Sequence, residues 1–225
     1  RPGPWCPRWG GVGLAWGMQR GHATIPSGTL GHLTRAEVDA AWELTALSRL
    51  LELGERWRGL AVPAGFEERF YRLNSLPHQL LALYRGLDPT DPDEDIVEEA
   101  EPAATAMVTQ HYLLDESVDL LYDSLDGDGP TTVRRAGREG GDAATGRRAV
   151  LLAVKRLYRD DWTTAAVMER LAATARLGLE ARPVLITPAP ERVDPALATR
   201  LGALLGQAVR AWVDGEGALV RLAPA

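Results

Sequence analysis

The stretch Ala149-Val-Leu-Leu-Ala-Val-Lys-Arg-Leu-Tyr158 decides which fold this sequence predicts. Its apolar residues suit a strand, because the stretch follows a glycine-rich connection and a short run of β-compatible residues. They also suit a helix, because Val150, Val154 and Tyr158 lie four residues apart. We interpret 149–158 as the second strand of a hairpin, with the helix left open as the alternative.

The sequence on either side of this stretch indicates strands and helices in turn. The elements that we expect are a strand at 131–135, a helix at 161–177, a strand at 183–187, a helix from 195 to 213 and a strand at 218–222. Together with 149–158 they give the order β-β-α-β-α-β. Residues 130–225 are therefore predicted to form a small α+β domain with a mixed sheet.

The residues before position 126 indicate helices. Thr34-Arg-Ala-Glu37 has the pattern of a capping box, in which the hydroxyl caps the helix and the glutamate reaches back. We expect an α-helical bundle over 34–126, with an acidic loop at 87–102 and one continuous helix over about 103–125. Asp126-Gly-Asp-Gly-Pro130 stops that helix, and we place a domain boundary there.

Residues 1–33 differ in composition from the rest of the chain. Their first eleven positions are dense in proline and glycine, which favour irregular structure. We expect this segment to be poorly ordered. Met18 is a possible true start, and whether residues 1–33 belong to the native protein stays open.

Charge is sharply segregated along the chain, although the net charge is only -6. The 88–129 segment contains many carboxylates and no lysine or arginine, whereas the 131–159 segment is strongly basic. Such asymmetry favours two surfaces or two domains with different electrostatic roles. The residues that we predict to bind an anion or nucleic acid are Arg134, Arg135, Arg147, Arg148, Lys155, Arg156 and Arg159.

The sequence lacks the patterns typical of membrane proteins, disulfide-bonded proteins and EF-hand proteins. No apolar run approaches the roughly 18 residues that span a bilayer, and a single cysteine, Cys6, cannot form an intrachain disulfide. We therefore expect a cytoplasmic protein with no membrane association. Asp91, Asp93 and Asp95 alternate like an EF-hand loop, but Ile96 stands where that loop needs glycine. We predict no metal site and no cofactor.

One enzyme family has a partial likeness to this sequence. Val150-Leu-Leu-Ala-Val-Lys155, followed by a helix and by Pro183-Val-Leu-Ile186, resembles the core of the restriction-endonuclease-like nucleases. The resemblance implies a lysine on a core strand beside metal-binding carboxylates. Ala153 stands where such an enzyme has a carboxylate, so the resemblance implies a site that is either inactive or uses a displaced carboxylate.

These observations leave three hypotheses. The first is a non-catalytic binding or regulatory protein whose basic region 131–159 contacts an acidic partner, either nucleic acid, an acidic protein or its own acidic segment. The second is a divergent metal-dependent nuclease of the restriction-endonuclease-like fold, centred on Lys155. The third is a protein–protein interaction module that uses the apolar stripe of the helix at 103–125. The sequence leaves open whether the chain is an enzyme and what its oligomeric state is.

Overall fold

The computed structural model describes residues 33–225, and the expectations for residues 1–32 lie outside this part. Residues 33–225 form nine helices and seven strands, so the α+β class is correct. The helices are α1 (Arg35–Asp39), α2 (Trp42–Glu52), α3 (Ala64–Leu73), α4 (Leu76–Leu83), α5 (Glu94–Gln110), α6 (Asp115–Ser124), α7 (Arg147–Asp160), α8 (Thr164–Thr174) and α9 (Pro195–Leu205). The strands are β1 (Leu60–Val62), β2 (Pro130–Arg135), β3 (Asp142–Thr145), β4 (Val184–Pro188), β5 (Arg192–Val193), β6 (Val209–Val213) and β7 (Leu219–Pro224).

A four-stranded antiparallel sheet of order β1-β4-β2-β3 separates two hydrophobic cores. Successive side chains of a strand point to opposite faces of its sheet. In β4, Val184 and Ile186 accordingly join one core, while Leu185 between them joins the other. Both faces of this sheet are therefore covered.

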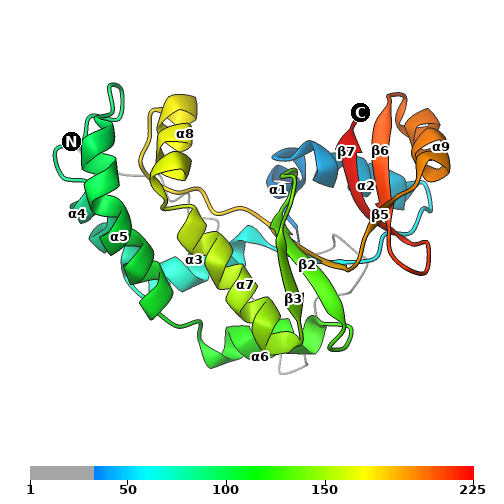
Figure 1. Cartoon of the computed structure of the whole chain (residues 1–225), viewed down its shortest axis with the longest axis horizontal. Helices are drawn as coiled ribbons and strands as arrows, with labels where there is room; N and C mark the ends of the chain where they lie inside the picture. The colour runs from blue at the N-terminus through cyan, green and yellow to red at the C-terminus, as the bar shows by residue number, and fades with distance from the viewer. Residues whose placement is uncertain (1–32) are drawn as a thin grey trace.

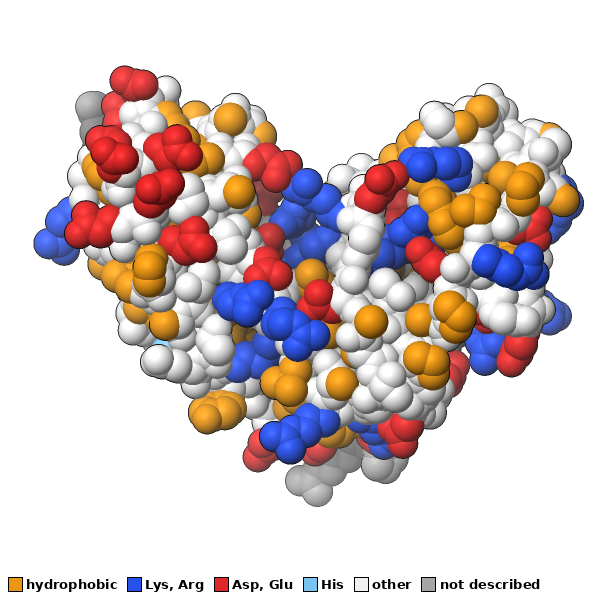
Figure 2. Space-filling model, viewed as in Figure 1, with side chains coloured by type: hydrophobic (Ala, Val, Ile, Leu, Met, Phe, Trp, Pro, Cys, Tyr) orange, Lys and Arg blue, Asp and Glu red, His pale blue; other side chains and the backbone are white. Residues whose placement is uncertain are grey.

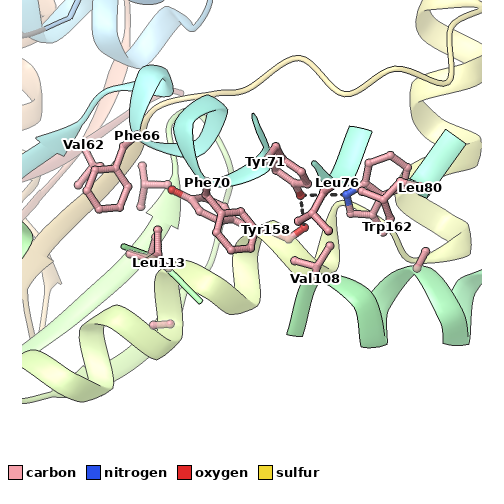
Figure 3. Close-up of a cluster of buried hydrophobic side chains, with 14 of the residues drawn as sticks. Val62, Phe66, Phe70, Tyr71, Leu76, Leu80, Val108, Leu113, Tyr158 and Trp162 are labelled. Atoms are coloured by element: carbon pink, nitrogen blue, oxygen red, sulfur yellow. Dashed lines mark hydrogen bonds between the residues drawn. The ribbon is translucent and has the colours of Figure 1, made fainter. Parts of the chain in front are cut away.

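The larger core lies between the sheet and helices α3 to α8. Figure 3 shows its aromatic centre, where Phe70, Tyr71, Tyr158 and Trp162 pack together. The indole N–H of Trp162 donates to Tyr71 Oη at 2.9 Å, and that hydroxyl donates to the carbonyl of Tyr158 at 3.1 Å. These buried polar groups are thus satisfied inside an apolar cluster.

The smaller core lies on the other face of the sheet. It is built by α1, α2, α9 and a second sheet of order β5-β6-β7. Leu47 of α2, Leu201 of α9 and Leu222 of β7 are buried in it. Both cores combine residues from 34–126 with residues from 130–225, so these two sequence regions pack against each other in both cores.

The prediction of a strand at 149–158 is wrong, because these residues lie in helix α7. Val150, Ala153, Val154 and Tyr158 are buried on one face of α7, which is the helical spacing of the alternative. The second strand of the hairpin is β3 instead, inside the predicted glycine-rich connection. Gly146 has a positive φ of 83° and marks the change from β3 to α7.

This helix changes the predicted strand order. The order from β2 onward is β-β-α-α-β-β-α-β-β, in place of β-β-α-β-α-β. The core strand on which the resemblance to restriction-endonuclease-like nucleases depends is absent at 149–158. The helix predicted over 195–213 also ends early, because Gly206 takes the left-handed conformation and β6 follows.

The acidic loop predicted at 87–102 is wrong in its second half, where α5 begins at Glu94. The side chain of Asp93 caps this helix by accepting from the backbone N–H of Asp95 at 3.1 Å. Acidic residues in the first turn suit the positive end of the helix dipole. The continuous helix predicted over 103–125 is also wrong, because residues 111–114 separate α5 from α6.

Candidate anion-binding surface

Arg134 was predicted to bind an anion, but its side chain is part of the interior. Its guanidinium group donates to both carboxylate oxygens of Glu43 on α2, at 2.6 Å each. Glu43 also accepts from the backbone N–H groups of Gly137 at 2.9 Å and Leu222 at 3.3 Å. Only 1% of Arg134 is exposed, so no external partner can reach it.

Arg135 is also held inside the protein. It donates to both oxygens of Glu67 on α3 at 2.8 Å, to the carbonyl of Arg182 at 2.6 Å and to Asp161. Burial opposes the charge of Arg135, but the carboxylates of Glu67 and Asp161 outweigh burial and raise its pKa. Arg135 therefore stays charged and joins α3 to the end of α7.

The remaining predicted residues all lie on α7, and most of them share one face. Because an α-helix has 3.6 residues per turn, positions 148, 152, 155, 156 and 159 fall within one side of the helix. This side, which we call the cationic face of α7, contains Arg148, Leu152, Lys155, Arg156 and Arg159. It extends over about 16 Å of helix. Figure 2 shows blue side chains gathered down the middle of this view of the molecule.

Two arginines of the cationic face have a nearby carboxylate. Arg156 donates to Asp142 at 2.6 Å, and Arg159 donates to Asp160 at 2.8 Å. Each arginine remains about 40% exposed. Pairs this open to solvent are weak and exchange readily with another anion. Arg148 is exposed and has no ionic partner in the described part of the chain.

Arg147 lies outside the cationic face. It is 3.8 Å from Asp128, which belongs to the acidic 88–129 segment. Within residues 33–225 this is the only ion pair between that segment and the basic region 131–159. The basic region is therefore not neutralised by the acidic segment of its own chain.

Lys155 has a structural role on the cationic face. Its ammonium group donates to the carbonyl of Thr109 at 2.9 Å and to the carbonyl of His111. These carbonyls belong to the end of α5, where helices lack internal donors and favour positive charge. Partial burial lowers the pKa of Lys155. A compact ammonium with three donors suits this position.

Tyr112 lies beside Lys155, and sequence reasoning missed it. Its side chain is 82% exposed, and Lys155 Nζ is 5.5 Å from the centre of its ring. Tyr112 belongs to the short connection between α5 and α6. The sequence offered no signal for it, because the connection was predicted to be helical.

The hairpin formed by β2 and β3 ends in a notch between two arms of the molecule (Figures 1 and 2). One arm contains α4, α5 and α8, and the other contains α9 and the β5-β6-β7 sheet. Two adjacent residues of its turn tie it to both arms. Arg138 donates to Glu169 of α8 at 2.7 Å, and Glu139 accepts from Arg210 of β6 at 2.7 Å. Arg138 is therefore an exposed cation that pairs with a carboxylate of α8.

A cavity of about 250 Å³ lies beside the start of α7, with Gly146, Ser124 and Pro188 in its wall. Its arginine, Arg58, is paired with Asp214 at 3.0 Å and Glu216 at 2.7 Å. The wall also contains Asp126, which forms no ion pair within residues 33–225, so carboxylates outnumber cations there and the cavity does not suit an anion.

Among residues 33–225 no group of three or more histidine, cysteine, aspartate or glutamate side chains could hold a metal ion. The described helices include none with the length and apolar character that crossing a membrane requires. The helical stripe predicted for protein–protein contact is broken at 111–114, and Leu121 and Leu125 lie buried in the larger core.

No protein-family model matches this chain, and a search of curated proteins finds no significant match. The candidate surface is an arginine-rich helix face with an exposed aromatic ring at its edge.

Proposed function

We propose that this protein is a non-catalytic binding protein that holds an acidic partner on the cationic face of α7. The observation that carries the proposal is the alignment of Arg148, Arg156 and Arg159 with Lys155 on one exposed side of a single helix. Arginine forms bidentate contacts with phosphates and carboxylates. Side chains already placed in a row lose little entropy when a linear polyanion binds along them.

Two features support an external partner over an internal one. Within residues 33–225, the only ion pair between the acidic 88–129 segment and this region joins Asp128 to Arg147, outside the cationic face. The carboxylates that do touch the face are Asp142 of β3 and Asp160 at the end of α7, and both stay partly exposed. The face therefore keeps a net positive charge, which attracts anions.

The test is a binding measurement by fluorescence anisotropy at several salt concentrations. The probes are a single-stranded oligonucleotide of about 15 nucleotides and a polyglutamate peptide of similar charge. Replacing Arg148→Glu together with Arg159→Glu is expected to weaken binding at least about tenfold. For the oligonucleotide, the slope of log affinity against log salt should fall by about 0.7 for each lost contact.

The matched control is Arg72→Glu together with Arg85→Glu. Arg72 and Arg85 are exposed and, within residues 33–225, form no ion pair, so this variant changes net charge by the same amount elsewhere on the surface. It is expected to bind as the unmodified protein does. Equal losses in both variants would show a general charge effect and would refute a specific face. Absence of saturable binding to both probes would refute the proposal altogether.

A further inference from the structure

We infer that the acidic partner is single-stranded nucleic acid, with the ring of Tyr112 stacking on a base while the cationic face of α7 holds the phosphates. This inference rests on the proposed function. It adds the chemical class of the partner and a residue outside the basic region. Its basis is the combination of an exposed aromatic ring with a row of cations.

The exposure of Tyr112 is unusual within the part of the chain that the structure describes. Its 82% exposed side chain is more open than any other large hydrophobic side chain in residues 33–225. The neighbouring Leu113 is only 8% exposed, because it packs into the larger core. An aromatic ring held in water beside a buried neighbour is available for contact with a partner.

The backbone that carries this ring is fixed on both sides. The side chain of Asn74 donates to the carbonyl of Tyr112 at 3.2 Å, and Lys155 donates to the carbonyl of His111 just before it. The connection between α5 and α6 is thus tied to both α3 and α7. A ring presented on an anchored backbone loses less entropy on binding than a ring on a free loop.

Lys155 joins the ring to the cationic face. Its ammonium is 5.5 Å from the centre of the Tyr112 ring, within the range of a cation–π contact. On α7, Leu152 and Arg148 follow on the same side of the helix, about 5 and 10 Å from Lys155. Ring, ammonium, aliphatic side chain and guanidinium therefore form one continuous row.

This row matches the chemistry of a single strand better than that of the other anions. Proteins bind single strands by tracking the phosphates with basic side chains and stacking the bases on aromatic rings. A base pair in a duplex has no free face for Tyr112, and an acidic peptide has carboxylates but no planar base. The negative charge nearest to Tyr112 along the chain, which would repel a phosphate, is that of the exposed Asp115, three residues further on.

The experiment measures the affinity of the full chain for four anionic probes, of which the duplex carries about twice the charge of the single strand. These are a single-stranded oligonucleotide of about 15 nucleotides, the same strand with abasic sugars, its duplex and a polyglutamate peptide. For the intact single strand, Tyr112→Ala is expected to weaken binding at least about fivefold, whereas Tyr112→Phe should bind like the unmodified protein. The effect of Tyr112→Ala should shrink on the abasic strand, where no base is left to stack.

The matched control is Leu114→Ala, which trims another exposed apolar side chain of the same connection, 44% exposed. It is expected to leave the affinity for the single strand unchanged. If all four probes bind and Tyr112→Ala alters none of them, the inference fails while the proposed function stands. Tighter binding of polyglutamate than of the single strand would point to an acidic protein and would also overturn the inference. If no probe binds, the proposed function falls and this inference with it.

Discussion

Arg134 and Arg135 are neighbours in β2, yet their guanidinium groups lie on opposite sides of the four-stranded sheet and are held by different helices. Glu43 of α2 binds the first, and Glu67 of α3 binds the second. A slip of one residue in the pairing of β2 would bring each guanidinium into the wrong core. The two ion pairs therefore fix the register of the strand.

Removing the carboxylate of Glu43 is expected to destabilise the protein strongly. Glu43→Gln leaves the Arg134 charge buried without compensation, and such a change costs about 3–5 kcal/mol of unfolding free energy. Urea unfolding followed by circular dichroism measures this cost. The control is Arg35→Ala, which removes an exposed pair with Asp39 and should cost less than about 1 kcal/mol. Similar losses of unfolding free energy in both variants would show that the buried ion pair stabilises the protein no more than an exposed one does.

Replacing Lys155 tests its role at the end of α5. Lys155→Met keeps the aliphatic chain but removes the donors to the carbonyls of Thr109 and His111. We expect a loss of about 1–3 kcal/mol, together with faster amide hydrogen exchange in the last turn of α5. Arg159→Met, which loses only an exposed pair with Asp160, should leave that exchange unaltered. Unchanged exchange in Lys155→Met would contradict the assignment.

The pH dependence of stability has a component from Glu101 on α5. Its carboxylate accepts from the backbone N–H of Thr164 at 2.6 Å, at the start of α8, and the bonds from Thr164 lower the pKa of Glu101 below 4.5. A carboxyl whose folded pKa is lowered stabilises the protein above its unfolded pKa, and this stabilisation is lost as pH falls through the folded pKa.

Glu101→Gln is therefore expected to reduce stability by about 0.5–1 kcal/mol at neutral pH, the usual weight of a charge at a helix N-terminus. The difference from the unmodified protein should stay constant above about pH 6 and vanish as pH falls below 4.5. Thermal unfolding at a series of pH values measures it. A difference that grows on acidification would mean that the sign of the pKa change is wrong.

The turn of the β2–β3 hairpin depends on close packing at Gly141. A Cβ atom there would lie 2.9 Å from the carbonyl oxygen of Val133 and 2.7 Å from a methyl group of Thr132. Gly141→Ala is expected to cost about 1–3 kcal/mol by overpacking. Gly65→Ala is the comparison, since its Cβ would meet no atom within 4 Å and the residue lies in helix α3. Chemical denaturation should show that substitution to be neutral or stabilising.

The local parts of the fold could be predicted from the sequence. The capping box at Thr34 and Glu37 is present, with the hydroxyl of Thr34 accepting from the N–H of Glu37. The strands at 131–135 and 183–187 are also present as β2 and β4. Each of these signals depends on residues close together in the chain, which is why they could be recognised.

The long-range parts could not be predicted, because they depend on pairing. Asp142–Thr145 has little preference for a strand, yet β2 pairs with it and makes it β3. Once β3 completes the hairpin, 149–158 is free to be the helix that its spacing also allowed. Local periodicity alone could not decide between these outcomes.

The buried arginines had one detectable signal that was missed. Glu43 lies four residues before Leu47, in line with the apolar stripe of α2, so its side chain faces the core. A carboxylate on such a stripe needs a buried cation. Either arginine of β2 could have been proposed as that cation. The sequence does not show which of the two pairs with Glu43, because β2 lies about 90 residues further along the chain.

In the turn of the β2–β3 hairpin, the order of Arg138 and Glu139 along the chain determines which ion pairs can form. Arg138 faces the glutamate of one arm, and Glu139 faces the arginine of the other. Exchanging the two residues would preserve composition and net charge, but it would set cation against cation and anion against anion. The order of these two residues therefore specifies the polarity with which the turn joins the two arms.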